Sequence, residues 1–256
     1  MLINKNKDRM YSLGRGFSNI PPVVKNLIII NILMLLASFT AASVFNVDLN
    51  SILGLHFPKS QLFEPYQVIT HMFMHGGIAH LFFNMFALFM FGRVLESVWG
   101  PRRFFIYYFV SGLGAALVHE AVIGVQYAKL VNQLSPADMQ LVIDRGYEIL
   151  NQGRTFTDPA MRQMNGLLNV STVGASGAVF GILLAFGVLF PNTQLFLLFP
   201  PIPIKAKWLV IGYGGLELYL ALAQPGSNIA HAAHLGGMIF GYILIRIWRK
   251  TTKTLY

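Results

Sequence analysis

The sequence predicts an all-α membrane protein, a bundle of six transmembrane helices in which the fourth is short. Three observations support this fold class. The 256 residues are 55% hydrophobic and only 11% charged, whereas soluble domains carry about 25% charged residues. Six apolar segments have lengths near those needed to cross a bilayer. Basic residues gather in the loops and tails of one side, as expected for cytoplasmic segments.

The apolar segments divide the chain into spans, loops and tails. They cover roughly Val24–Phe45, Ile78–Val94, Phe104–Ile123, Ser176–Phe190, Trp208–Ala223 and Ile229–Trp248. We therefore expect a six-helix domain over residues 23–250, with tails at 1–22 and 251–256. The longest loop, residues 124–173, contains a stretch at 136–150 whose apolar spacing predicts a surface helix, either at the membrane interface or solvated.

The distribution of Lys and Arg predicts the topology. An even number of spans places both termini on one side, and with that side cytoplasmic it receives 14 of the 19 basic residues. These are Lys5, Lys7, Arg9, Arg15, Lys25, Arg93, Arg102, Arg103, Lys205, Lys207, Arg246, Arg249, Lys250 and Lys253. We expect both termini in the cytoplasm, and the inner membrane as the location in a bacterium. This topology explains the net charge of +9 without a nucleic-acid partner.

The fourth segment is too short to span alone. From Ser176 to Pro191 it offers 15 helical residues, roughly 22 Å at about 1.5 Å per residue, against a hydrocarbon core of about 30 Å. The preceding residues 167–175 must therefore descend as irregular backbone, which survives at depth only inside protein or beside a watery cavity. We expect Ser176, in Gly174-Ala175-Ser176-Gly177, at the floor of a cavity open to the outside. The alternative is that this serine is an ordinary helix N-cap.

Histidines on two other segments point to the same depth. His234 lies nearer than His231 to the direction of Gly237 and Gly241, the face that would meet Gly177 on the fourth helix. A histidine beside a serine hydroxyl activates it as a nucleophile. The His231–His234 spacing does not favour a metal site, so we expect no metal ligands.

The second segment carries His80 and Asn84, four residues apart on one helix face. These side chains either bind neighbouring helices or direct two donors at a developing oxyanion. His71 and His75 precede the span and are expected in an interfacial segment or loop.

Two acids lie at notable depths in the predicted bundle. Glu120 lies near the outer end of the third segment, and Glu217 lies inside the fifth. Glu217 either orients His234 as a third member of a triad or is a structural hydrogen-bonding partner. Nothing in the spacing places it beside His234.

Taken together, these motifs resemble those of the rhomboid intramembrane serine proteases. The motifs are Gly174-Ala175-Ser176-Gly177, His234-Leu235-Gly236-Gly237 and His80-Leu81-Phe82-Phe83-Asn84, in that family's spatial arrangement. The resemblance covers about Val24 to Trp248. It implies a Ser176–His234 dyad that acts through an acyl-enzyme.

The resemblance also implies roles for other residues. His80 and Asn84 would stabilise the oxyanion, and Phe83 would lie near the substrate path. The substrates would be single-span membrane proteins in the lipid bilayer, with no cofactor. Two positions depart from the family: Pro65-Tyr66-Gln67 replaces a common Trp-Arg pair, and Phe180 replaces a common Tyr.

Two rival functions are compatible with parts of the pattern. An inactive relative that only binds membrane proteins would typically lack the serine or histidine, and both are present. A small transporter or proton channel would also use buried polar residues and broken helices, but the halves of this sequence show no inverted repeat.

Overall fold

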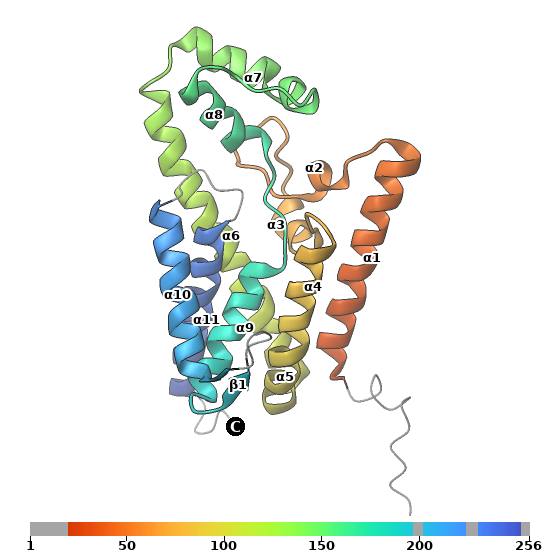
Figure 1. The fold of residues 1–256 in the computed structure, drawn as a ribbon, viewed down its shortest axis with the longest axis vertical. Coiled ribbons are helices and arrows are strands. Elements are labelled where there is room, and N and C mark those ends of the chain that lie inside the picture. Colours follow the sequence, from red (N-terminus) through yellow and green to blue (C-terminus); the bar gives the residue numbers. More distant parts are fainter. Residues whose placement is uncertain (1–19, 197–201, 224–229, 252–256) are drawn as a thin grey trace, which may run out of the picture.

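The computed structural model describes residues 20–196, 202–223 and 230–251 (Figure 1). Most of the predicted N-terminal tail and residues 252–256 of the C-terminal tail lie outside the described residues. Within them the chain is mainly helical, which confirms the predicted helical class.

The helices follow one another with short connections. They are α1 (Pro22–Phe45), α2 (Leu49–Leu53), α3 (Gln67–Thr70), the 3-10 turn η2 (His71–Phe73), α4 (Ile78–Ala87), the π-helical turn η3 (Leu88–Gly92), α5 (Arg93–Trp99), α6 (Pro101–Val131), α7 (Pro136–Asn151), α8 (Pro159–Asn169), α9 (Ser176–Leu189), α10 (Ala206–Ala223) and α11 (His231–Thr251). Two short strands, β1 (Gln194–Phe196) and β2 (Pro203–Lys205), pair antiparallel with Leu195 opposite Ile204.

Three of the described helices are long and apolar enough to cross a membrane. These are α1, the continuous helix from Ile78 to Trp99 that joins α4, η3 and α5, and α6. The apolar helix α9 has only 14 residues, roughly 21 Å at about 1.5 Å per residue. Six spans therefore remain a prediction.

The segment between α6 and α9 differs from its prediction in two ways. Helix α6 extends to Val131, so the loop expected from residue 124 begins later. The predicted helix at 136–150 is present as α7, but α8 was not predicted. The start signals of α8 are clear in retrospect, because the Asp158 side chain accepts from Met161 N and Pro159 occupies the first turn.

Helix α9 lies inside the bundle, packed against α6 and α11 (Figure 1). Ten of its 14 residues are buried, and the other four lie partly buried along one face, at Ser176, Phe180, Leu184 and Val188. A helix that is apolar all round belongs in an interior. By contrast, α1 exposes many large apolar side chains, including Leu33 and Leu36. An exposed apolar surface of this kind is suited to lipid contact.

Glycines let α9 and α11 approach closely. A Cβ at Gly237 would overlap the backbone carbonyl of Gly177, and a Cβ at Gly181 would lie 3.0 Å from the carbonyl oxygen of Gly237. A Cβ at Gly177 would also overlap Ala115 of α6. Small residues at such crossings bring backbones together in membrane helices. Of the predicted glycine face of α11, Gly237 thus meets the glycines of α9, whereas Gly241 lies against Tyr107 and Ser111 of α6.

A buried carboxylate anchors the first helix. Glu96 on α5 accepts hydrogen bonds from the backbone nitrogens of Val23 and Val24 at 2.9 and 2.8 Å. These N–H groups belong to the first turn of α1, which has no earlier carbonyl to pair with them. The negative charge also complements the positive end of the helix dipole.

The outer helices form a satellite core attached to the bundle. Leu130, Val142 and Met164 bury their side chains together where α6, α7 and α8 meet. Figure 1 shows α7 and α8 beyond the ends of the bundle helices. Tyr147 of α7 lies 3.2 Å from the Ser51 hydroxyl of α2, so this satellite also contacts the segment between α1 and α4.

We predict that Gly237→Ala destabilises the protein, whereas Gly212→Ala does not. The added methyl at Gly237 meets rigid backbone of α9, and overpacking typically costs about 1–3 kcal/mol. Gly212 on α10 has no atom within 4 Å of its would-be Cβ, and alanine is favoured over glycine in a helix by about 1 kcal/mol. Thermal unfolding in detergent should show a lower Tm for Gly237→Ala alone. Equal Tm values for both variants would contradict the close α9–α11 contact.

Candidate active site

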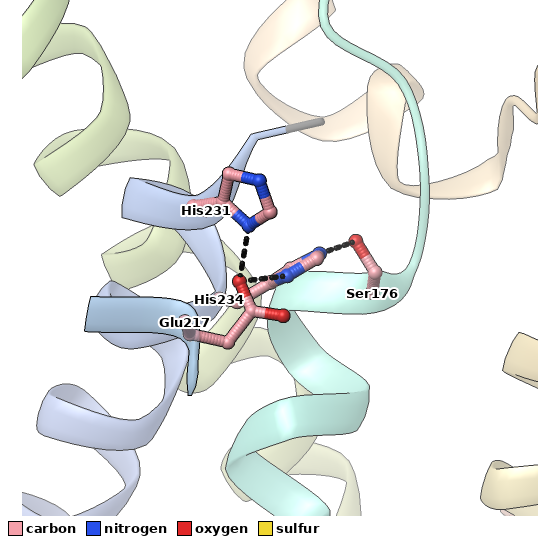
Figure 2. Close-up of polar contacts among 4 residues, drawn as sticks. All are labelled: Ser176, Glu217, His231 and His234. Atoms are coloured by element: carbon pink, nitrogen blue, oxygen red, sulfur yellow. Dashed lines mark hydrogen bonds and ion pairs between the residues drawn. The ribbon is translucent and has the colours of Figure 1, made fainter. Parts of the chain in front are cut away.

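Ser176 is the first residue of α9, and its hydroxyl faces another helix. The N-cap is Ala175, and no side chain caps the helix. Ser176 Oγ lies 2.9 Å from His234 Nε2 of α11 (Figure 2). The serine is therefore not the N-cap that a simple structural explanation would require.

The chain that leads down to Ser176 is held by backbone pairing. Thr172 and Leu55 exchange hydrogen bonds of 2.8 and 2.9 Å, and Gly174 N donates to His71 O at 2.9 Å. Gly174 has φ = +129°, a conformation that glycine adopts without the penalty other residues incur. Irregular backbone at this depth is thus paired with the segment between α1 and α4, as buried backbone requires.

A small cavity adjoins the serine. Its volume is about 20 Å³, and its lining includes His71, Thr172, Ser176 and Ala233. A cavity of this size holds about one water molecule. Ser176 itself is half-buried and lines this cavity, so the residue is partly shielded from solvent.

Two rings and one hydroxyl define the orientation of His234. The ring stacks on Phe180 of α9 with a centroid separation of 4.1 Å and an interplanar angle of 8°. Phe180, which replaces the common Tyr, thus supplies an aromatic stack for His234. His231 lies one turn earlier, edge-on to His234 at 6.3 Å between centroids.

Glu217 of α10 is buried against both histidines (Figure 2). Its Oε2 atom lies 2.6 Å from His231 Nδ1, a hydrogen bond, and 3.0 Å from His234 Nδ1. The second contact is short, but its angle is too oblique for a hydrogen bond. His234 Nδ1 therefore has no hydrogen-bond partner among the described residues. The Ser176 hydroxyl, the His234 imidazole and the Glu217 carboxylate thus lie next to one another.

Glu217, His231 and His234 also form a candidate metal site among the described residues. Their ligand atoms all lie within 4.8 Å of one another. However, Glu217 Oε2 is already within hydrogen-bonding distance of His231 Nδ1, and His234 Nε2 faces Ser176. The donor set is thus paired within the protein, and a cation would have to displace the His231–Glu217 hydrogen bond.

His80 and Ser176 both lie close to Gly174. A Cβ built on Gly174 would lie 3.0 Å from His80 Nε2 and 3.6 Å from Ser176 Oγ. Asn84 is buried one turn further along α4, and its side-chain nitrogen donates to the His80 carbonyl at 3.1 Å. The structure therefore places His80 beside the serine, while Asn84 bonds to its own helix.

The other residues that the sequence singled out lie around this centre. Phe83 is 63% exposed on α4 and packs edge-on against Phe82. His71 and His75 lie between α2 and α4, as expected, but both are buried. Burial, and secondarily the adjacent His80, lower the pKa of His75 to about 4, so its ring is neutral at physiological pH.

Some functional contacts were not predictable from spacing. Glu217 precedes His234 by 17 residues on another helix, and no periodicity relates the two. Gln67, at the position of the departure from Trp-Arg, is buried and donates to the carbonyls of Ile52 and Leu62 at 3.1 and 2.9 Å. Its amide thus holds the segment between α1 and α4 together, a role its sequence context did not indicate.

The chain is similar to known proteins over the region that contains the candidate site. A model of the rhomboid domain matches residues 62–251. RHOMBOID-like protein 12, mitochondrial, of Arabidopsis thaliana is 29% identical over 73% of this chain and 46% of its own length. Rhomboid protein 1, mitochondrial, of Saccharomyces cerevisiae is 27% identical over 72% of this chain and 42% of its own length. Rhomboid protease AarA of Providencia stuartii is 28% identical over 68% of this chain and 52% of its own length.

The chain thus spans about half the length of these curated relatives. The family model nevertheless covers most of the chain, from before α3 to the end of α11. Together with the long apolar helices, it shows that this integral membrane protein belongs to the rhomboid family.

Proposed function

We propose that the chain is an intramembrane serine endopeptidase with Ser176 as nucleophile and His234 as general base. The observation that carries this proposal is the 2.9 Å contact between Ser176 Oγ and His234 Nε2. It occurs at the N-terminus of a short apolar helix inside the bundle. A nucleophile within hydrogen-bond reach of a base is the arrangement that covalent catalysis requires.

The proposed reaction proceeds through an acyl-enzyme. Ser176 Oγ attacks the scissile carbonyl carbon while His234 Nε2 takes the hydroxyl proton. As the tetrahedral intermediate collapses, the C–N bond breaks and His234 returns the proton to the leaving amine. Water then attacks the ester while His234 takes its proton. The C–O bond to Ser176 breaks, His234 returns the proton to Ser176 Oγ, and the carboxylic acid is released.

The N-terminus of α9 offers backbone N–H groups that suit an oxyanion hole. Its first backbone N–H groups lack carbonyl partners within the helix and carry partial positive charge. We infer that the Ser176 N–H, the His80 ring and the Asn84 amide hold the developing oxyanion. The position of His80 beside Gly174 supports this role. Asn84 would have to exchange its bond to the His80 carbonyl for one to the substrate.

The substrate class follows from the position of the site. We infer that single-span membrane proteins enter with part of their helix unwound near the outer face, because the serine lies inside the bundle. Phe83 is exposed on α4 and suits contact with such a segment. The bundle helices alternate in direction (Figure 1), which fits six spans with cytoplasmic termini.

The two rival functions fit the site less well. The family has inactive members, and Inactive RHOMBOID-like protein 8 of Arabidopsis thaliana is 35% identical over 54 residues. This chain, however, retains both Ser176 and His234, in hydrogen-bond contact. In a transporter, that contact would have no evident purpose.

The first test is cleavage of a model single-span substrate in proteoliposomes. We predict cleavage by the native chain, and none by Ser176→Ala or His234→Ala, because each substitution removes a partner of the nucleophile–base pair. A fluorophosphonate should label the native chain and His80→Ala, but not Ser176→Ala. Cleavage by purified Ser176→Ala would refute the assigned nucleophile. A native chain silent on several substrates and unlabelled by fluorophosphonate would favour the rival functions.

The second test concerns the oxyanion. We predict that His80→Ala and Asn84→Ala each lower kcat about 10²–10³-fold with little change in KM, the usual effect of removing one oxyanion donor. Asn169→Ala is the matched control, since Asn169 of α8 bonds to Asn165. Its kcat should equal that of the native chain. A raised KM with unchanged kcat in the α4 variants would instead assign these residues to substrate binding.

A further inference from the structure

Glu217 is a buried acid that a serine–histidine dyad does not use. It is 7% exposed, midway along α10. Ionisable side chains at such depth are costly unless paired, and are typically functional. Both of its recorded partners are histidines of α11, and one of them is His234.

The tautomer of His234 makes the contact significant. For Nε2 to accept the Ser176 proton, the ring's own proton must reside on Nδ1. That Nδ1 atom is buried and lacks a well-aligned acceptor. Glu217 Oε2 lies 3.0 Å from it.

His231 fixes the position of the carboxylate. Its Nδ1 donates to the same Oε2 atom at 2.6 Å, and both side chains are buried. Glu217 is therefore anchored independently of His234. A purely structural link between α10 and α11 would need only the His231 bond and would not require the approach to His234.

We propose that Glu217 is a positioning residue for His234, which makes the site a Ser176–His234–Glu217 triad with His231 as its anchor. This inference rests on the proposed protease function. When His234 takes the Ser176 proton, the imidazolium gains a carboxylate 3.0 Å away, and Glu217 stays ionised. The oblique contact would become aligned at that step, as catalytic hydrogen bonds often tighten only towards the transition state.

The titratable groups around His234 come from several helices. Glu217 lies on α10 and His231 on α11, while His80 of α4 and His119 of α6 interact with His234 electrostatically. Glu217 is the acid among these groups, so its removal acts on the charged form of His234 in a way that changes at the other positions cannot reproduce.

The test compares Glu217→Gln and Glu217→Asp with the native chain in the same proteoliposome assay. We predict that Glu217→Gln lowers kcat by about 10²–10⁴-fold at nearly constant KM, because the amide stabilises the wrong tautomer and carries no charge. Glu217→Asp should restore part of that loss. The acid limb of the pH–rate profile should move to lower pH in Glu217→Gln, since the imidazolium loses its counter-charge.

Glu120→Gln is the matched control. Glu120 is another acid with buried carboxyl oxygens, and it makes no hydrogen bond among the described residues. Its variant should keep the native kcat and the native pH profile. His231→Gln should lower kcat about 10-fold or less, and the double variant with Glu217→Gln should be no slower than Glu217→Gln alone, because His231 acts through Glu217.

Three outcomes would overturn the proposal. The first is Glu217→Gln with native kcat and an unmoved acid limb, even if its Tm falls, which would leave Glu217 a structural role. The second is a further loss of kcat in the double variant. The third is stoichiometric zinc in the purified chain with activity increased by EDTA, which would make the cluster a metal site. Cleavage by Ser176→Ala would refute the proposed function itself, and is a separate result.

Discussion

The close approach of α9 and α11 is the contact on which the rest of the site depends. The backbone of α9 at Gly177 meets Gly237 of α11 with no room for a side chain. Ser176 immediately precedes Gly177, and His234 lies one turn before Gly237, so a single backbone contact fixes the depth and separation of both. A methyl group between these helices would displace the hydroxyl from the ring, although neither residue had changed.

A second constraint is the cost of polar groups away from water. Two buried carboxylates of the described structure meet it by accepting hydrogen bonds from groups that need an acceptor, whereas Glu120 has no such partner there. Glu96 accepts from the first turn of α1, and Glu217 accepts from His231. The irregular chain before α9 is paired with Leu55 and His71. Each pairing also joins two segments distant in sequence, so the groups that would be most costly to bury connect the fold.

The sequence predicted the features that depend on local pattern. Apolar runs located the long helices to within a few residues, except that α6 continues to Val131, where its last turns pack Leu130 against α7 and α8. Motif order placed Ser176, His234 and His80 in one region. The contact of Glu217 with His234 was left open, because it depends on how α10 rotates against α11, and no spacing within one helix encodes that rotation. The hydrogen bonds from the Gln67 side-chain amide to the carbonyls of Ile52 and Leu62 were also missed, because they too depend on tertiary contacts.

The position of the Glu217 carboxylate can be explained by what orients the His234 ring. Stacking on Phe180 at 8° fixes the plane of the ring. An apolar stack, however, leaves rotation within that plane undetermined, and Phe180 has no hydroxyl with which to restrict it. One polar contact at each ring nitrogen supplies the missing restraint: Ser176 at Nε2 and Glu217 at Nδ1. In the proposed mechanism, this chain, with Phe180 in place of the common Tyr, would orient its base through Glu217 of a neighbouring helix and gain a counter-charge for the imidazolium by the same contact.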